Sequence, residues 1–246
     1  MQNISKNKIK WIRSLHSKKN RDSEQLFLVE GDKMIAESLV YKKENIHSIY
    51  YTNLSQLDLK TFSEFENFEI TEKELEQIST LKNPSKSFAV LKYDVVKPTK
   101  STFKIAVDTV QDPGNMGTIL RLADWFGVDE VICSFDTVDI YNPKVVQASM
   151  GAIFRVNVTY CDLPAYIKES ELPSYGAFLE GTNIYSSKLS PKGILVLGNE
   201  GNGISDAVKK EIDHYITIPK KGKSESLNVS TATGILLSEF FRNELL

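Results

Sequence analysis

The sequence contains only two cysteines and three histidines in 246 residues. Cys133 and Cys161 stand far apart, and no Cys/His spacing is typical of zinc, so we expect neither a disulfide scaffold nor a metal. No apolar run approaches the roughly 20 residues of a membrane-spanning helix. The N-terminal stretch lacks the apolar core and cleavage site of a secretory signal. These absences favour a cytoplasmic protein with no metal and no membrane contact.

Several common catalytic motifs are also missing. The absence of GxGxxG disfavours a nicotinamide Rossmann site, and no GxxxxGK[ST] indicates a P-loop. The histidines at 16, 47 and 214 are too scattered to form a convincing Ser/His/Asp triad.

Charge is distributed unevenly, although the net charge is only −2. Seven basic residues precede the first acidic residue, Asp22, and the rest of the chain has 23 basic against 32 acidic residues. The seven are Lys6, Lys8, Lys10, Arg13, Lys18, Lys19 and Arg21. This asymmetry suggests a basic arm that meets phosphate, and a solvated helix face is an equally good interpretation.

Residues 1–97 predict a small α/β domain. Ile4, Trp11, Ile12 and Leu15 share one face of a short amphipathic helix, and Thr71 with Glu74 has the spacing of a capping box. Strands are predicted over 26–31, 46–52 and 87–96, and helices over 32–41 and 71–79. The strand over 87–96 is predicted from its alternation of apolar and polar residues. The polar stretch 97–102 predicts a linker.

Residues 102–246 predict a second, larger domain in which apolar strands alternate with helices. Strands are expected at 104–110, 130–135, 154–160, 175–181, 193–198 and 215–219. Helices are expected at 117–127, 143–151, 164–170, 204–212 and 226–245. This order predicts an α/β fold whose sheet is mostly parallel, with helices on both faces.

Three polar, glycine-rich loops leave the carboxyl ends of predicted strands, where ligands bind in open α/β sheets. The segments that contain them cover residues 108–127, 194–205 and 218–234. Each also has an ordinary structural interpretation: Asn115 or Ser226 could cap a helix, Asn228 could stand in water, and Glu200 could be solvated in a turn. Arg121 could be exposed on the face opposite Ile119, Leu122 and Trp125.

Together the loops resemble a known family. The segments "QDPGNMGTILRLADWFGVDEVI", "LVLGNEGNGIS" and "IPKKGKSESLNVSTATGILL" resemble the three ordered motifs of the TrmH/SpoU RNA 2′-O-ribose methyltransferases, in the SPOUT superfamily. "VQASMGAIFRVNV" resembles the segment after the first motif, and "FLVEGDKMIAESL" resembles the family's ribosomal-protein-like substrate-binding domain. The resemblance implies an RNA-binding domain over 1–97 and a SPOUT catalytic domain over 102–246. It also implies a deep trefoil knot, bound S-adenosyl-L-methionine and a homodimer.

The resemblance also implies the site residues. Those expected at the cofactor are Thr182, Gly198, Asn199, Ile218 and Leu227. Those expected at the reaction centre are Asn115, Arg121, Glu200, Ser226 and Asn228. Gly198 should leave room for the ligand. Arg121 is the family's proposed base, although a phosphate-gripping arginine would leave the same signature, because guanidinium is effectively never deprotonated. Glu200 is expected to be buried beside a cation and to hold Asn115 or Arg121.

The implied activity is S-adenosylmethionine-dependent 2′-O-methylation of RNA, with ribosomal RNA favoured over transfer RNA and no DNA partner. "KKGK" at 220–223 adds positive charge beside the expected RNA path. The alternatives are a non-catalytic RNA-binding or ribosome-assembly protein and a cofactor-binding regulator without RNA. The apolar residues of the last helix, Leu236, Leu237, Phe240 and Phe241, exceed the evident needs of one small sheet and support the dimer.

Overall fold

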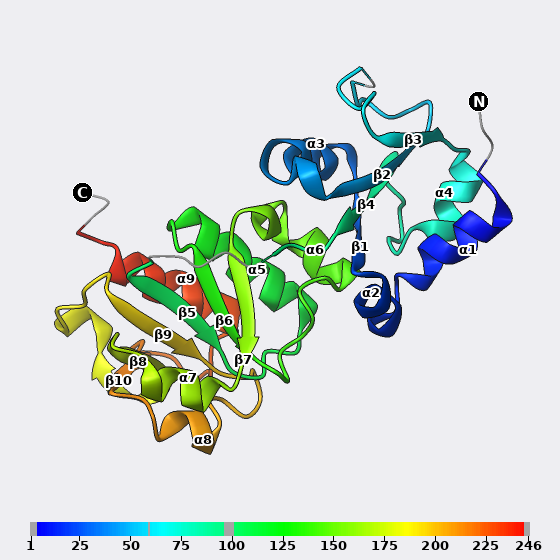
Figure 1. The fold of residues 1–246 in the computed structure, drawn as a ribbon. Coiled ribbons are helices and arrows are strands. Elements are labelled where there is room, and N and C mark those ends of the chain that lie inside the picture. The colour runs from blue at the N-terminus through cyan, green and yellow to red at the C-terminus, as the bar shows by residue number, and fades with distance from the viewer. Residues whose placement is uncertain (1–3, 59, 96–100, 244–246) are drawn as a thin grey trace. The chain divides into compact units, whose positions relative to one another are not determined.

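The computed structural model describes residues 4–58, 60–95 and 101–243. The chain forms two compact units (Figure 1): Met1–Val95 with Asp139–Phe154, and Val96–Val138 with Arg155–Leu246. Within the described ranges, no helix is long and apolar enough to cross a membrane. The linker predicted at 97–102 falls largely on residues outside the described ranges.

The first unit is built on a four-stranded mixed sheet of order β1-β4-β2-β3. β4 runs antiparallel to both β1 and β2, while β3 runs parallel to β2. The strands are β1 Leu26–Glu30, β2 Ile46–Tyr51, β3 Glu66–Glu69 and β4 Ser87–Lys92. The helices are α1 Lys6–Ser14, α2 Lys18–Glu24, α3 Asp32–Tyr41, η1 Lys43–Asn45, α4 Glu72–Ile78, α6 Pro143–Ser149 and η2 Ala152–Phe154. The predicted capping box of Thr71 and Glu74 is present.

Both faces of this sheet are covered by helices. Leu26 and Leu28 of β1 face the cluster that contains α1 and α4, whereas Phe27 and Val29 face the cluster that contains α3 and α6. β4 is buried from Ser87 to Leu91, so its apolar residues are nearly continuous. A strand is confirmed in this segment, but β4 ends at Lys92, short of the predicted range, and the alternation from which the strand was inferred is wrong.

The segment 139–154 belongs to the first unit, although it lies within the sequence range predicted for the catalytic domain. Val146 and Phe154 join the core cluster of α3. Asp139 accepts a 2.5 Å hydrogen bond from Arg21, which also donates to the carbonyl of Leu15. Arg21 is only 2% exposed, so this basic residue supports the fold and is not part of a solvent-facing arm.

The second unit contains a six-stranded sheet, of order β10-β8-β9-β5-β6-β7, in which every pairing is parallel. The strands are β5 Phe103–Val107, β6 Glu130–Ser134, β7 Asn157–Cys161, β8 Ser174–Asn183, β9 Gly193–Leu197 and β10 His214–Thr217. The helices are α5 Pro113–Trp125, α7 Leu163–Glu169, η3 Ile184–Ser186, α8 Asp206–Lys209 and α9 Val229–Phe240. The predicted parallel α/β sheet is confirmed, while α8 is shorter than the helix expected over 204–212.

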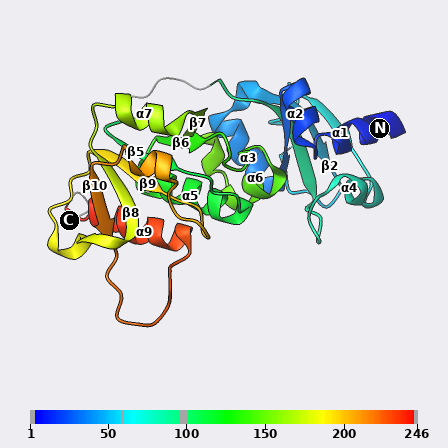
Figure 2. The ribbon, with the colours of Figure 1, turned by 90° about the horizontal axis from the view of Figure 1, so that it is seen from below.

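Helices cover both faces of the second sheet, with α7 and α9 on opposite sides (Figure 2). Leu163 and Val208 bring α7 and α8 onto one face. On α9, Leu236 and Leu237 are fully buried, and Phe240 packs against Phe103 at a ring distance of 5.0 Å. Leu236, Leu237 and Phe240 are therefore buried within their own unit, whereas Phe241 is half-buried. The three buried residues give no separate support to a dimer, and the dimer stays a prediction.

Candidate active site

The three predicted loops meet at the carboxyl edge of the parallel sheet. Residues 198–203 follow β9 and form a tight hairpin, in which Asn199 and Gly203 exchange two backbone hydrogen bonds of 2.9 Å. The side-chain amide of Asn199 donates to the carbonyl of Thr109, beyond β5, at 2.8 Å. The glycine-rich hairpin is thus tied to the start of the first loop.

Gly198 is fixed by the backbone of this hairpin. A Cβ at this position would lie 2.2 Å from the carbonyl carbon of Gly203 and 2.3 Å from the amide nitrogen of Ile204. Both atoms belong to the backbone, so a side chain would require the hairpin to open. The chain itself makes the close approach that was expected from a ligand.

Thr109 and Asp108, which sequence reasoning missed, hold the first loop in place. Thr109 has φ of 56°, which is uncommon for a β-branched residue and costs on the order of 1–3 kcal/mol. In this conformation its N–H donates to Ser134 Oγ at 2.9 Å while its carbonyl accepts from Asn199. The buried Asp108 carboxylate accepts from the backbone N–H of Ser205 at 2.7 Å, beyond the hairpin.

Asn115 lies in the first turn of α5. The helix is capped by Asp112, whose carboxylate accepts from the N–H of Asn115 at 2.8 Å, and Pro113 occupies the first helical position. The interpretation of Asn115 as the cap is therefore wrong. As the third helical residue, Asn115 keeps its side-chain amide available for partners outside the helix.

A directed chain of hydrogen bonds links all three motif loops. Asn228 caps α9, and its Oδ1 accepts from the N–H groups of Ser230 and Thr231 at 3.0 and 3.3 Å. Its Nδ2 therefore points outward and donates to Asn115 Oδ1 at 2.9 Å. Asn115 in turn presents its Nδ2 to Glu200 Oε1 at 2.7 Å. The backbone amides at the start of α9 thus set the orientation of both asparagine amides, and Glu200 is the terminal acceptor.

Ser230 completes this network and was not predicted. Its hydroxyl lies 2.6 Å from Asn228 Oδ1 and 3.3 Å from Asn115 Oδ1. The only signal in the sequence was its position two residues after Asn228. The interpretations of Ser226 as the cap of this helix and of Asn228 as a solvated first-turn residue are both wrong.

Glu200 differs from its prediction in one respect. It holds Asn115, as one of the two expected options, but its side chain is exposed and forms no ion pair with any described residue. The expected burial beside a cation is therefore wrong. What this carboxylate contributes here is an acceptor for a neutral amide.

Arg121 is exposed on α5. It makes no hydrogen bond or ion pair with a residue of the described ranges. Trp125, one turn later on the same face, is 83% exposed, so its predicted placement opposite Arg121 is wrong. The Arg121 guanidinium and the Trp125 indole are therefore both exposed to solvent on the same face of α5.

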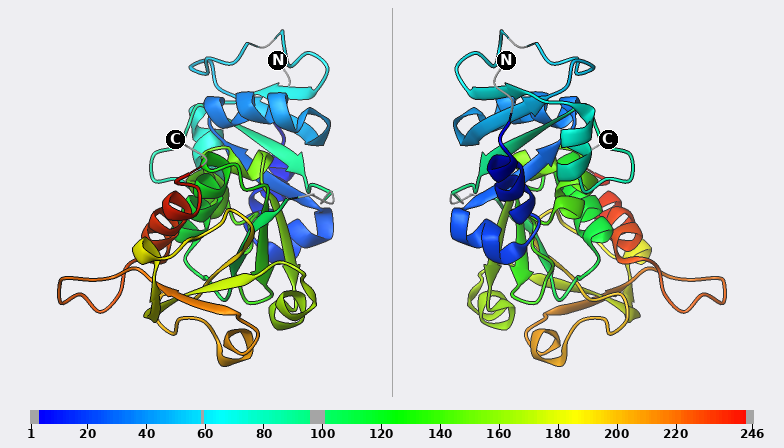
Figure 3. Two further views of the ribbon diagram at one scale, coloured as in Figure 1. Left: turned by 90° about the vertical axis from the view of Figure 1, so that its left-hand side faces the viewer. Right: turned by 90° about the vertical axis from the view of Figure 1, so that its right-hand side faces the viewer.

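The loop between β10 and α9 projects from the rest of the second unit (Figure 3). Residues 219–228 are exposed, including Lys220, Lys221 and Lys223. The Ser226 hydroxyl has no hydrogen-bond partner among the described residues, and Leu227 is 48% exposed. In the described structure Ser226 therefore forms no hydrogen bond with Asn115, although the nearby Asn228 does.

The remaining predicted cofactor residues lie at the same sheet edge. Thr182 pairs with Ile216 across β8 and β10, and Ile218 follows the end of β10. Gly198 and Asn199 directly follow β9, which is also a neighbour of β8. Four predicted residues thus lie at the ends of three adjacent strands.

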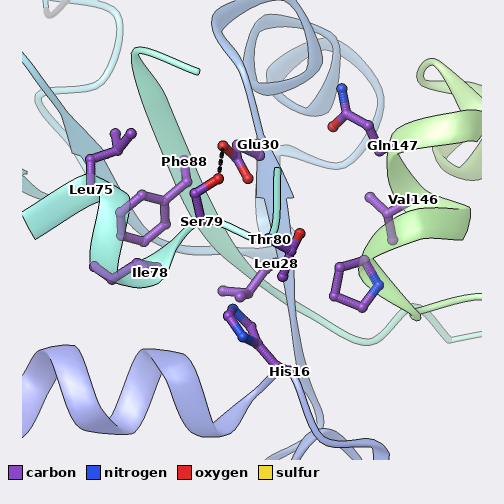
Figure 4. A pocket seen from close by; sticks show the side chains of 11 residues that line it. His16, Leu28, Glu30, Leu75, Ile78, Ser79, Thr80, Phe88, Val146 and Gln147 are labelled. Atoms are coloured by element: carbon purple, nitrogen blue, oxygen red, sulfur yellow. Dashed lines mark hydrogen bonds between the residues drawn. The ribbon is translucent and has the colours of Figure 1, made fainter. Parts of the chain in front are cut away.

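A pocket in the first unit contains none of the predicted site residues (Figure 4). His16, Glu30, Ser79, Phe88 and Gln147 are among its lining residues. Glu30 accepts a 2.6 Å hydrogen bond from Ser79. Burial lowers the pKa of His16 below its ordinary value.

Two family models match the chain. The "SpoU rRNA Methylase family" model covers residues 102–238, and the "MRM3-like substrate binding domain" model covers residues 6–89. The chain belongs to the SpoU rRNA methylase family. The first match includes all three motif loops and every predicted site residue.

Similar proteins support the same assignment over the full length. The 23S rRNA (guanosine(2553)-2′-O)-methyltransferase RlmP of Bacillus subtilis is 29% identical over 242 residues, which covers 96% of this chain and 97% of that protein. A TrmH-family protein from Porphyromonas gingivalis is 39% identical, with a TM-score of 0.86 and coverage of 98% and 99%. An AdoMet-bound rRNA methyltransferase from Sinorhizobium meliloti is 26% identical, with a TM-score of 0.87 and coverage of 98% of each chain.

Proposed function

We propose that this SpoU-family protein methylates the ribose 2′-hydroxyl of a ribosomal RNA nucleotide, with S-adenosylmethionine as methyl donor. The observation that carries the proposal is the hydrogen-bond chain from Asn228 through Asn115 to Glu200, which joins the three motif loops. The names of RlmP and of the Sinorhizobium structure support the substrate class and the cofactor. On this proposal, residues 1–97 bind RNA and residues 102–246 carry out the reaction.

The sheet edge suits S-adenosylmethionine. Thr182, Gly198, Asn199 and Ile218 lie at the ends of adjacent parallel strands, where ligands bind in open α/β sheets. The hairpin offers backbone groups for polar contacts, while Ile218 and the exposed Leu227 offer apolar surface. When bound, the cofactor supplies a methyl group on an electrophilic sulfonium. We propose that these five residues hold it.

Arg121 is proposed to bind an RNA phosphate and to orient the attacking ribose hydroxyl. Its guanidinium is exposed and free of partners among the described residues, so it is available for substrate. A role as general base is less compatible with a group that is effectively always protonated. The attack requires alignment and proton removal, because a ribose hydroxyl is a weak nucleophile.

The other predicted reaction-centre residues have supporting roles in this proposal. Asn115, Asn228 and Glu200 hold the three loops in one arrangement. Ser226, whose hydroxyl is uncommitted in the described structure, is proposed to hydrogen-bond substrate from the lysine-bearing loop. Lys220, Lys221 and Lys223 on that loop are proposed to contact RNA phosphates.

A homodimer, a trefoil knot and a cytoplasmic location complete the proposal. The homodimer and the knot are expected from the family likeness, and the cytoplasmic location is the expectation from composition.

Methyl transfer from labelled S-adenosylmethionine to unmodified total RNA tests the function. We expect label at one ribosomal site that resists alkaline cleavage, because a methylated 2′-oxygen cannot attack the adjacent phosphate. Arg121→Ala should abolish this transfer and leave stability and cofactor binding unchanged, because the guanidinium has no internal partner among the described residues. Lys168→Ala, an exposed change on α7, is the control and should remain active.

The outcome also separates the alternatives. Label in transfer RNA alone would replace ribosomal RNA as the substrate. RNA binding without transfer to any RNA would favour a non-catalytic assembly protein, and cofactor binding without RNA binding would favour a regulator.

A further inference from the structure

The structure divides the seven early basic residues into two groups. Arg21 is buried and bonded to Asp139, Lys8 pairs with Glu66 at 3.7 Å and lies over the Trp11 ring, and Lys18 pairs with Asp22 at 3.0 Å. These three side chains form ion pairs within the first unit. The other four, Lys6, Lys10, Arg13 and Lys19, are exposed and have no carboxylate within ion-pair distance among the described residues.

Three of the four free cations lie on one face of α1. Lys6, Lys10 and Arg13 are spaced by four and three residues, which places them in a row along one side of a helix. Ile9 and Ile12 bury a different side of α1 in the core cluster shared with α4. The row, which we call the α1 stripe, therefore stands beside the buried face and is held in place by it.

The surroundings leave the stripe positively charged. Glu66, a carboxylate that contacts α1, is already paired with Lys8. Glu74 of the neighbouring α4 is held by the backbone and hydroxyl of Thr71. Glu72 and Glu76 of α4 are exposed and form no ion pair with the stripe. An isolated row of cations attracts an anionic partner more strongly than a row that is neutralised internally.

We propose that the α1 stripe of Lys6, Lys10 and Arg13 binds consecutive phosphates of the RNA substrate. This inference rests on the proposed function and assigns residues to its RNA contact. The stripe spans about 10 Å along the helix at 1.5 Å per residue, and long Lys and Arg side chains can extend from it to two or three phosphates. Such contacts position the RNA without reading its sequence.

The stripe fits RNA better than it fits an anionic membrane. A helix that lies on a membrane surface needs a free apolar face beside its cations. In α1 the apolar residues Ile9 and Ile12 are already buried in the unit. A polyphosphate chain needs only the cations.

The test compares two triple variants of the full chain. K6Q/K10Q/R13Q removes the stripe with residues that keep a good helix propensity. K33Q/K60Q/K86Q removes the same charge from exposed, unpaired lysines elsewhere in the first unit. The probe is unmodified 23S ribosomal RNA transcribed in vitro, and affinity is measured from about 50 to about 200 mM salt, a range in which each phosphate contact contributes clearly.

The plot of log affinity against log salt has a negative slope. We expect this slope to be less steep in the stripe variant by about 2, because three phosphate contacts contribute about 0.7 each. This difference in slope corresponds to a loss of about a hundredfold in the affinity of the stripe variant for RNA at about 100 mM salt. The control variant should keep the wild-type slope. In methyl transfer the stripe variant should show a raised KM for RNA, with an unchanged KM for S-adenosylmethionine and an unchanged kcat at saturating RNA.

Three results would overturn the inference. A stripe variant with the wild-type slope would remove the stripe from the RNA contact while the proposed function stands. Equal losses in the two variants would show that overall charge, not the stripe, attracts RNA. If the wild type bound neither RNA nor transferred methyl groups, but bound vesicles containing phosphatidylserine, the proposed function would fail together with the inference.

Discussion

The side-chain amide of Asn115 donates to the carboxylate of Glu200 at 2.7 Å, across 85 positions of the sequence. The direction of this bond is set elsewhere, because Asn228 already occupies the acceptor oxygen of Asn115. The pair therefore needs a donor at 115 and an acceptor at 200.

Asn115→Asp tests this polarity. The substitution keeps the shape but places a second carboxylate against Glu200, so repulsion should separate the loops. We expect methyl transfer to fall more than in Asn115→Ala, by about a hundredfold or more if about 3 kcal/mol of alignment is lost. The measurement is single-turnover methyl transfer at saturating RNA and cofactor.

The double variant N115D/E200Q is the matching control. The glutamine amide introduced at position 200 can donate to the carboxylate introduced at position 115, which restores a hydrogen bond of opposite polarity and removes the repulsion. Activity should therefore recover relative to Asn115→Asp alone. No recovery would mean that the pair does not act through this contact.

Asn228 has two functions that substitution can separate. It caps α9 and it donates to Asn115. Asn228→Ala should lose both, with a stability cost of about 1 kcal/mol for the cap. Asn228→Asp keeps an acceptor for the helix N–H groups but loses the donor, so it should unfold like the wild type and still methylate poorly. Urea unfolding and methyl transfer, measured on both variants, check this; a fully active Asn228→Asp would contradict the proposed orientation chain.

Much of the fold could be predicted because the spacing of apolar residues along the sequence indicates which face of a helix or strand is buried. The helix at 32–41 and the strand at 194–197 were readable in this way. β3 and α2 were missed because their sequences, "ENFE" and "KKNRDSE", carry almost no apolar signal. The segment 139–154 was assigned to the catalytic domain because its neighbours in the sequence belong there. In the structure it belongs to the first unit, because its packing partners are distant in the sequence.

The sequence predicted that the three loops lie at one edge of the sheet, but it did not predict the contacts between them. The family resemblance implied Asn115, Glu200 and Asn228 as site residues, and their mutual hydrogen bonds join residues that are distant in the chain. Thr109 gave no signal, since its left-handed backbone depends on partners from β6 and the hairpin. Glu200 was expected to be buried beside a cation, but it lies in an exposed hairpin, where a carboxylate remains in contact with water.

Gly198→Ala distinguishes a glycine needed by the fold from one needed only by a ligand. The new Cβ would overlap the backbone of Gly203 and Ile204, so the protein without cofactor should lose about 1–3 kcal/mol of stability. Gly201→Ala is the matched control, because its Cβ would meet only Asn199 Oδ1, at 3.5 Å. Urea unfolding without cofactor measures both. If Gly198→Ala were as stable as the wild type and merely failed to bind cofactor, the backbone explanation would be wrong.

The first unit should lose stability in mild acid through two histidines. Burial lowers the pKa of His16, as do Arg13 and Arg21, against opposing effects of the Ile78 backbone and Glu30. Burial, together with Lys8, also lowers the pKa of His47. In the unfolded chain both groups titrate near the ordinary value of about 6.5. The folded state therefore binds fewer protons below that pH.

The sign of the pH effect follows from this difference. Above about pH 7.5 the two histidines should not change the free energy of unfolding with pH. As the pH drops through about 6.5 toward the lowered pKa values of the folded state, the free energy of unfolding should fall, because the unfolded chain binds more protons than the folded chain. H16Q/H47Q should remove this dependence, while His214→Gln, which changes a histidine of the second unit, should keep it. Urea unfolding at about pH 7.5 and about pH 5.5, followed by a spectroscopic signal of the first unit such as Trp11 fluorescence in a Trp125→Phe background, measures the difference. A double variant that loses as much stability in acid as the wild type would assign the effect to carboxylates, because the two half-buried histidines would then contribute nothing to it.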